Sequence, residues 1–131
     1  MPVTLELRAD GHVLVYTFRG RWNVSEVMAL FPEEKRYRDN ASHIVHALVD
    51  VQESRNIPAG LINLRHGPGP GHPRAGYVVF VGAPPMGRPL ITAIYRVMRF
   101  ERFRFFDTAE EAWAFLNRLI LTESTTPPLQ F

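Results

Sequence analysis

The sequence predicts a single α/β domain with a mixed, mostly parallel sheet of about five strands and helices on both faces. Three observations lead to this fold class. Apolar side chains alternate along two short runs at the N-terminus, which is typical of half-exposed strands in a hairpin. Two later runs are apolar almost throughout, as in strands buried on both faces of a parallel sheet. Helical periodicity separates these strands, and strands that alternate with helices imply right-handed crossovers.

The N-terminal runs are predicted to form antiparallel strands over residues 3–8 and 12–19. Asp10 and Gly11 lie between them, and an Asp-Gly pair between two alternating runs is a strong hairpin signal. The hairpin makes the sheet mixed rather than wholly parallel.

Residues 23–40 are predicted to be helical, with a kink or restart at Pro32, which has no amide proton to donate. Asn23 and Glu26 have the spacing of a capping box. The apolar positions follow at i, i+3, i+4 and i+7: Val24, Val27, Met28 and Phe31. A polar stretch, "EEKRYRD", completes the helix, and Asn40 ends it.

The rest of the chain continues the alternation of strands and helices. The predicted strands are "HIVHALVDV", "GYVVFVG" and "FRFF", and the predicted helices are "PAGLINLRH", "RPLITAIYRVMRFER" and "DTAEEAWAFLNRLIL". In the second of these helices the residues expected to face the core are Leu90, Ile94, Val97 and Met98. In the last helix the core stripe is Ala109, Ala112, Trp113, Leu116, Leu119 and Ile120.

Length and composition set the domain boundaries. A chain of 131 residues with 46% hydrophobic residues suits one folded domain, which we expect over residues 1–122, followed by a flexible tail over residues 123–131. The absence of cysteine excludes disulfides, thiolate metal sites and cysteine nucleophiles. The sequence shows neither a signal-peptide pattern nor an apolar run of membrane-spanning length, so we expect a cytoplasmic location without stable membrane insertion.

Charge points only weakly to a partner. The net charge is +2, which does not favour nucleic acid as a partner. Arg96, Arg99 and Arg102 are spaced i, i+3, i+6 and are expected on one helix face. That face could contact an anionic partner, or it could simply be solvated and partly neutralised by Glu101.

The segment from Arg65 to Gly76, "RHGPGPGHPRAG", is rich in glycine, proline and histidine. A phosphate-binding loop follows a strand and opens a helix, whereas this segment follows a helix and precedes a strand. A zinc site would need His43 and His46 to face the same way, and a spacing of three on a strand points them apart. We therefore expect no metal and no cofactor, and interpret the segment as a surface loop that could also act as a lid.

Polar residues cluster near the carboxyl end of the third strand, where open α/β sheets bind ligands. Asp50 could orient a ligand or accept backbone amides from the next loop. Ser54, Arg55 and Asn56 follow in that loop. Since no base is fixed beside Ser54, it is not expected to be a nucleophile.

Together these segments resemble the STAS domain, and more closely its SpoIIAA-like, SEC14-like branch. The resemblance covers about residues 3–121 and is carried by "VYTFRGRW", "HIVHALVDV", "PAGL", "YVVFVG" and "FRFFDTAEEAWAFL". It implies the STAS fold and, in regulatory members, a phosphorylated serine at the start of the short helix. Here Gly60 and Leu61 match that motif, but Pro58 and Ala59 stand where its serines would be.

The resemblance and the residues together lead to two functional hypotheses. The first is a non-catalytic regulatory or protein-interaction module that lacks the family phosphoserine; the second is a SEC14-like carrier or sensor of a small apolar or anionic ligand. Self-association as a homodimer stays open. The candidate partner- or ligand-binding residues are Asp50, Ser54, Arg55, Asn56, Ala59, Gly60, Arg96 and Arg99. An internal cavity of several hundred Å³, lined by residues such as Ile91, Tyr95 and Phe115, would favour the carrier.

Overall fold

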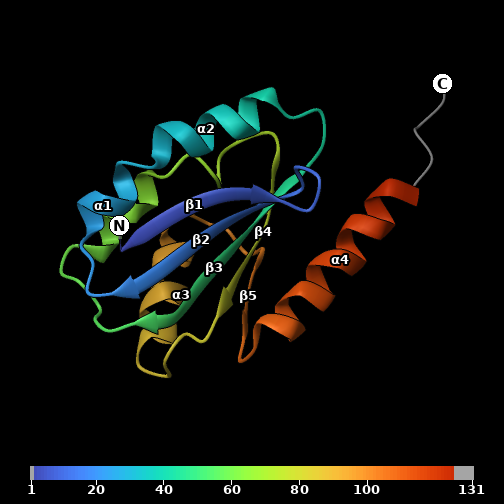
Figure 1. Ribbon diagram of the computed structural model, residues 1–131. Helices are drawn as coiled ribbons and strands as arrows, with labels where there is room; N and C mark the ends of the chain where they lie inside the picture. The colour runs from blue at the N-terminus through green and yellow to red at the C-terminus, as the bar shows by residue number, and fades with distance from the viewer. Residues whose placement is uncertain (1, 126–131) are drawn as a thin grey trace.

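The computed structural model describes residues 2–125, which form one five-stranded sheet with helices on both faces (Figure 1). The elements in chain order are β1 (Val3–Arg8), β2 (Val13–Gly20), α1 (Val24–Met28), α2 (Phe31–Asn40), β3 (Val45–Ser54), the 3-10 helix η1 (Leu61–His66), β4 (Ala75–Val81), α3 (Gly87–Val97), β5 (Phe103–Phe106) and α4 (Ala109–Thr125). The strands lie in the order β1-β2-β3-β4-β5. The first pair is antiparallel and the other three pairs are parallel, which confirms the predicted fold class.

The β1–β2 hairpin closes through a longer turn than a two-residue Asp-Gly loop. Arg8 pairs with Val13, so four residues lie between the strands. Ala9, Asp10 and Gly11 all adopt left-handed backbone conformations, with φ of 55°, 54° and 84°. Glycine and aspartate tolerate this conformation better than most residues, which explains why Asp10 and Gly11 occupy the turn of the hairpin.

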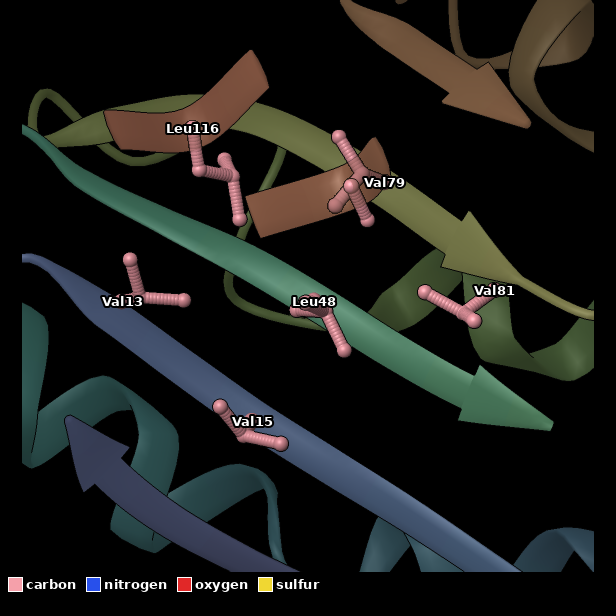
Figure 2. Packing of buried hydrophobic residues seen from close by; sticks show 7 residues of the cluster. Val13, Val15, Leu48, Val79, Val81 and Leu116 are labelled. Atoms are coloured by element: carbon pink, nitrogen blue, oxygen red, sulfur yellow. The ribbon is translucent and has the colours of Figure 1, made fainter. Parts of the chain in front are cut away.

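Within residues 2–125, α4 is the one helix that covers the first face of the sheet. Its buried core consists of Val13, Val15, Leu48, Val79, Val81, Ala112 and Leu116. Figure 2 shows the valines and Leu48 on the neighbouring strands β2, β3 and β4, in one cluster with Leu116 of α4. Most of the apolar stripe predicted for the last helix packs here, with Ala112 and Leu116 fully buried and Trp113 partly buried. Phe115 joins this cluster in place of the predicted Leu119.

The other face is covered by α1, α2, η1 and α3, and its core is divided. One cluster joins β1 and β2 to α1 and contains Val3, Tyr16, Phe18, Trp22 and Val27. A second joins β3 and β4 to the segment around α3 and contains Ala47, Val78, Phe80, Ala83 and Phe100. The partly buried Val49 and Val51 of β3 pack against both clusters.

The inward face of α3 differs from the one predicted. Ile94 and Met98 pack inward as expected, but Leu90 and Val97 are 41% and 67% exposed. The inner stripe is instead Ile91, Ile94, Tyr95 and Met98. Both sets have helical spacing, so periodicity alone could not choose between them; the packing against β4 and β5 decides it.

Helix α3 is shorter than predicted and includes one of the three arginines that were expected on it. α3 stops at Val97, and Arg99 adopts a left-handed conformation with φ of 56°. Arg96 is therefore on the helix, whereas Arg99 and Arg102 lie in the connection to β5. The prediction that the three share one helix face is wrong, because the chain turns immediately after Met98 to start the next strand.

Two further boundaries differ from the prediction. The short helix after β3 is a 3-10 helix that begins at Leu61 rather than at Pro58, and Gly60 precedes it with φ of 79°. α4 extends to Thr125, so the first residues of the predicted tail belong to the helix. The rest of that tail, residues 126–131, lies outside the described residues.

Candidate functional site

A cavity of about 530 Å³ lies between the sheet and the helices that cover its divided face. Alternation along β3 points Val49 and Val51 into it, while β2 and β4 contribute Tyr16, Phe18 and Phe80. The helices supply the opposite wall, which includes Val27, Phe31, Leu61, Leu64, Ile91, Ile94, Tyr95 and Met98. The cavity thus occupies the space between the two core clusters, and its volume is in the range of small-molecule sites.

A buried ion pair interrupts this apolar lining. Glu34 and Arg38 lie one turn apart on α2 and are 6% and 2% exposed. Arg38 Nε donates to Glu34 Oε2 at 3.0 Å, and the Tyr16 hydroxyl donates to Glu34 Oε1 at 2.6 Å. A second guanidinium nitrogen, Nη1, donates to the Val45 carbonyl. These bonds compensate the desolvation of both charges.

The two tyrosines of the cavity wall are held in the neutral, proton-donating form. Burial and the neighbouring Glu34 carboxylate raise the pKa of Tyr16 far above its usual range. Burial is also the main reason that the pKa of Tyr95 is raised; Glu34 raises it further, whereas Arg38 lowers it. Tyr95, Glu34 and Arg38 all line the same cavity.

The glycine- and proline-rich segment packs over the ion pair. An added Cβ on Gly69 would lie 2.8 Å from Glu34 Oε2, and one on Gly67 would lie 3.2 Å from the Phe31 ring. His72 Nε2 lies 2.7 Å from the Asp39 carboxylate, which fastens the segment to the end of α2. The glycines permit this close approach, so the segment forms part of the cavity wall.

Three of the predicted site residues line the cavity together. Trp22 Nε1 donates to the Ser54 hydroxyl at 2.8 Å, and the Asn56 side chain bonds both the amide and the carbonyl of Trp22 at 3.0 and 2.9 Å. Arg55 is exposed at the rim, and its amide donates to the Gly20 carbonyl. Ser54 and Asn56 thus hold the indole in the wall, a role that the sequence did not indicate.

The other predicted site residues lie elsewhere. Asp50 stands between Val49 and Val51, so its side chain points to the opposite face of the sheet, where it accepts from the Gln52 amide at 3.0 Å. This matches the alternative in which Asp50 accepts a backbone amide. Ala59, Gly60, Arg96 and Arg99 are exposed and do not line the cavity. Phe115, expected in a cavity wall, packs against Tyr77 and Phe106 on the α4 side.

Comparison with known proteins connects this architecture to one fold. No protein-family model matches the sequence, and no curated protein does. Two solved structures superpose on most of it. A protein of the DUF3478 family with a SpoIIAA-like fold, from Shewanella loihica PV-4, is 17% identical with a TM-score of 0.58, over 87% of this chain and 91% of its own. The anti-sigma factor antagonist SpoIIAA in its unphosphorylated form is 14% identical with a TM-score of 0.56, over 88% of this chain and 97% of its own.

The protein is a SpoIIAA-like domain in its fold. This confirms the fold that the sequence resemblance implied. In this SpoIIAA-like domain Pro58 lines the cavity, whereas Ala59 and Gly60 form the exposed turn before η1. No helix within residues 2–125 is long and apolar enough to cross a membrane.

Two histidines of this SpoIIAA-like domain, His12 and His43, lie side by side with ring centroids 4.0 Å apart, but they are not joined by a third metal ligand within the described residues. His43 Nε2 lies 2.9 Å from the Gly11 carbonyl, while His46 is buried on β3 and lies beside Glu123 of α4. His72 is engaged by Asp39 on α2. Over the described part of the chain, no group of three or more histidine, aspartate or glutamate side chains could hold a metal ion.

Sequence reasoning missed the polar end of the cavity. Glu34 and Arg38 lie in "EEKRYRD", which was interpreted as a polar helix end. An i, i+4 pair of opposite charges has the same spacing on a solvated surface as in a protein interior. The nearest signal was Tyr16, a polar aromatic residue on a strand predicted to be covered.

Proposed function

We propose that this SpoIIAA-like domain is a non-catalytic carrier or sensor that holds a small, largely apolar molecule between the sheet and helices α1, α2, η1 and α3. The observation that supports this is the cavity itself, because a well-packed domain of this size leaves few voids larger than a water molecule. Here about 530 Å³ is open beside apolar side chains from three strands and four helices.

The arrangement around the cavity supports binding rather than catalysis. Its buried charges, Glu34 and Arg38, are paired with each other, and Tyr16 donates to the same carboxylate. Ser54, the hydroxyl nearest the rim, accepts from Trp22 and donates to the Asn56 carbonyl. Pro58 and Ala59 occupy the positions of the family's serines, so the proposal includes no phosphorylation switch.

The proposal is tested with purified, full-length protein and the apolar dye N-phenylnaphthylamine. The dye should bind and fluoresce in wild type. Val49→Phe places a phenyl ring in the cavity and should abolish dye binding. Leu121→Phe, at an exposed position of α4, should leave dye binding intact. Equal dye binding by all three proteins would contradict a ligand site in this cavity.

A regulatory, protein-binding role is the second candidate, supported by the structural similarity to an anti-sigma factor antagonist. Native mass spectrometry of the purified protein distinguishes the two. An added mass of a few hundred daltons, lost in Val49→Phe, supports the carrier. A stoichiometric protein partner without any small ligand supports the interaction module.

A further inference from the structure

The polar end of the cavity carries no net charge. Glu34 and Arg38 face each other at 3.0 Å and offset one another's charge. The other charged residue in the lining, Arg55, is exposed at the rim and away from the buried pair. A charged group brought into the interior would therefore meet no unpaired opposite charge, and would lose its hydration without compensation.

The same end offers hydrogen-bond donors. Arg38 uses Nε and Nη1 in the bonds described above, and its third nitrogen, Nη2, has no hydrogen-bond partner among residues 2–125. The Tyr95 hydroxyl also has no such partner within that range. Both atoms are accessible to open space. Among the described residues, the fully buried side-chain polar atom that lacks a hydrogen-bond partner is His12 Nδ1, so neither Arg38 Nη2 nor the Tyr95 hydroxyl is fully buried.

Each Glu34 oxygen of this cluster already accepts one bond, from the Tyr16 hydroxyl or from Arg38 Nε. Arg38 can only donate, and the raised pKa keeps a proton on the Tyr95 hydroxyl, so it can also donate. An uncharged ligand oxygen that accepts hydrogen bonds matches these two unused donors.

Resting on the proposed carrier function, we propose that the ligand of this cavity is a neutral amphiphile: an apolar chain or ring system with a hydroxyl or carbonyl oxygen that accepts hydrogen bonds from Arg38 Nη2 and Tyr95. The apolar portion lies against Val49, Val51 and the helices, and the oxygen atom lies at the Glu34–Arg38 end.

Three probes with the same chain test the head group: decanol, decanoate and decylamine, each displacing N-phenylnaphthylamine from the full-length protein near neutral pH. Decanol should displace the dye at a concentration about tenfold or more below that of either ion, because each ion must be buried without a free partner. Equal or stronger displacement by decanoate would overturn the inference while leaving the carrier function standing. If the dye binds and none of the three probes displaces it, the head-group inference fails and the carrier function stands; if the dye itself does not bind, the carrier function fails.

The variant Glu34→Gln changes the net charge of the buried pair from zero to +1. It keeps the size of the side chain and one acceptor oxygen, which can serve the Tyr16 or the Arg38 bond, and it leaves the guanidinium charge unpaired. We expect the preference for decanol over decanoate to fall by about tenfold. An unchanged preference in folded Glu34→Gln protein would contradict the role of the pair.

A second variant avoids the charged pair. Tyr95→Phe removes one donor and keeps the ring, so decanol affinity should fall about fivefold more than dye affinity does. A decanol affinity equal to that of wild type would remove Tyr95 from the site. Decanoate binding that is strong in wild type and lost in Arg55→Gln would instead place an anionic head at the rim and overturn the proposal.

Discussion

Among single residues, Gly76 leaves space that the His46 imidazole occupies. A Cβ on Gly76 would lie 2.2 Å from His46 Nδ1 and 2.7 Å from Ile44 Cγ2, far inside contact distance. His46 is 1% exposed, and its Nδ1 accepts from the Tyr77 amide at 2.9 Å. The imidazole therefore lies directly against the backbone of β4, and any side chain at Gly76 would displace it.

Gly76→Ala should lower the free energy of unfolding by about 1–3 kcal/mol, the range typical of overpacking. Gly71→Ala is the matched control, since nothing lies within 4 Å of its added Cβ, and it should change stability by less than about 0.5 kcal/mol. Urea denaturation of both variants measures the difference. Equal stabilities would show that His46 moves aside at little cost.

Among the elements, α4 is the helix of the described chain that covers one face of the sheet, and Leu116 lies at the centre of its buried stripe. Leu116 is fully buried in one cluster with the valines of β2 and β4 (Figure 2). Its neighbour Asn117 is exposed. Leu116→Ala should destabilise the protein by about 2–5 kcal/mol through lost burial and a cavity. Asn117→Ala should be close to neutral in the same thermal or urea melts. A small effect of Leu116→Ala would indicate that α4 is only loosely docked.

At the scale of the whole molecule, His46 links the centre of the sheet to the end of α4. Its Nδ1 accepts from Tyr77, so its proton is on Nε2, which lies 3.1 Å from a Glu123 oxygen 77 residues later in the chain. Burial lowers the pKa of His46 below 6.5, with His12 and Arg38 acting in the same direction and Glu123 opposing them. The folded protein therefore favours the neutral imidazole.

This link predicts a pH-dependent stability. Because the pKa of His46 is lower in the folded state than its unfolded value of 6.5, the stability it contributes is present above about pH 6.5 and is lost as the pH falls toward the folded pKa. Urea midpoints of wild type should drop between about pH 7.5 and about pH 5.5. His46→Gln, although less stable overall, should show a shallower drop. Parallel slopes for the two proteins would assign the pH dependence to other groups.

The amino-acid sequence was enough to predict the alternation of strands and helices, the antiparallel hairpin and the parallel strands that follow. These rest on local signals: alternation before and after Asp10-Gly11, the capping spacing of Asn23 and Glu26, and the continuous apolar stripe of α4. Each signal depends on contacts between residues close in sequence, or on apolar side chains that become buried whichever segment packs against them. Such signals can be recognised without knowing the tertiary structure.

The inward face of α3 and the position of the buried polar residues could not be predicted from the sequence, because both depend on packing between distant segments. Leu90 and Val97 have helical spacing yet are exposed, because the choice of face depends on strands far away in the sequence. Glu34 and Arg38 have the spacing of a solvated pair, but the Gly67–Pro70 segment closes over them. The cavity is the space left when α2 and α3 pack on separate core clusters, and no local pattern encodes the distance between two helices.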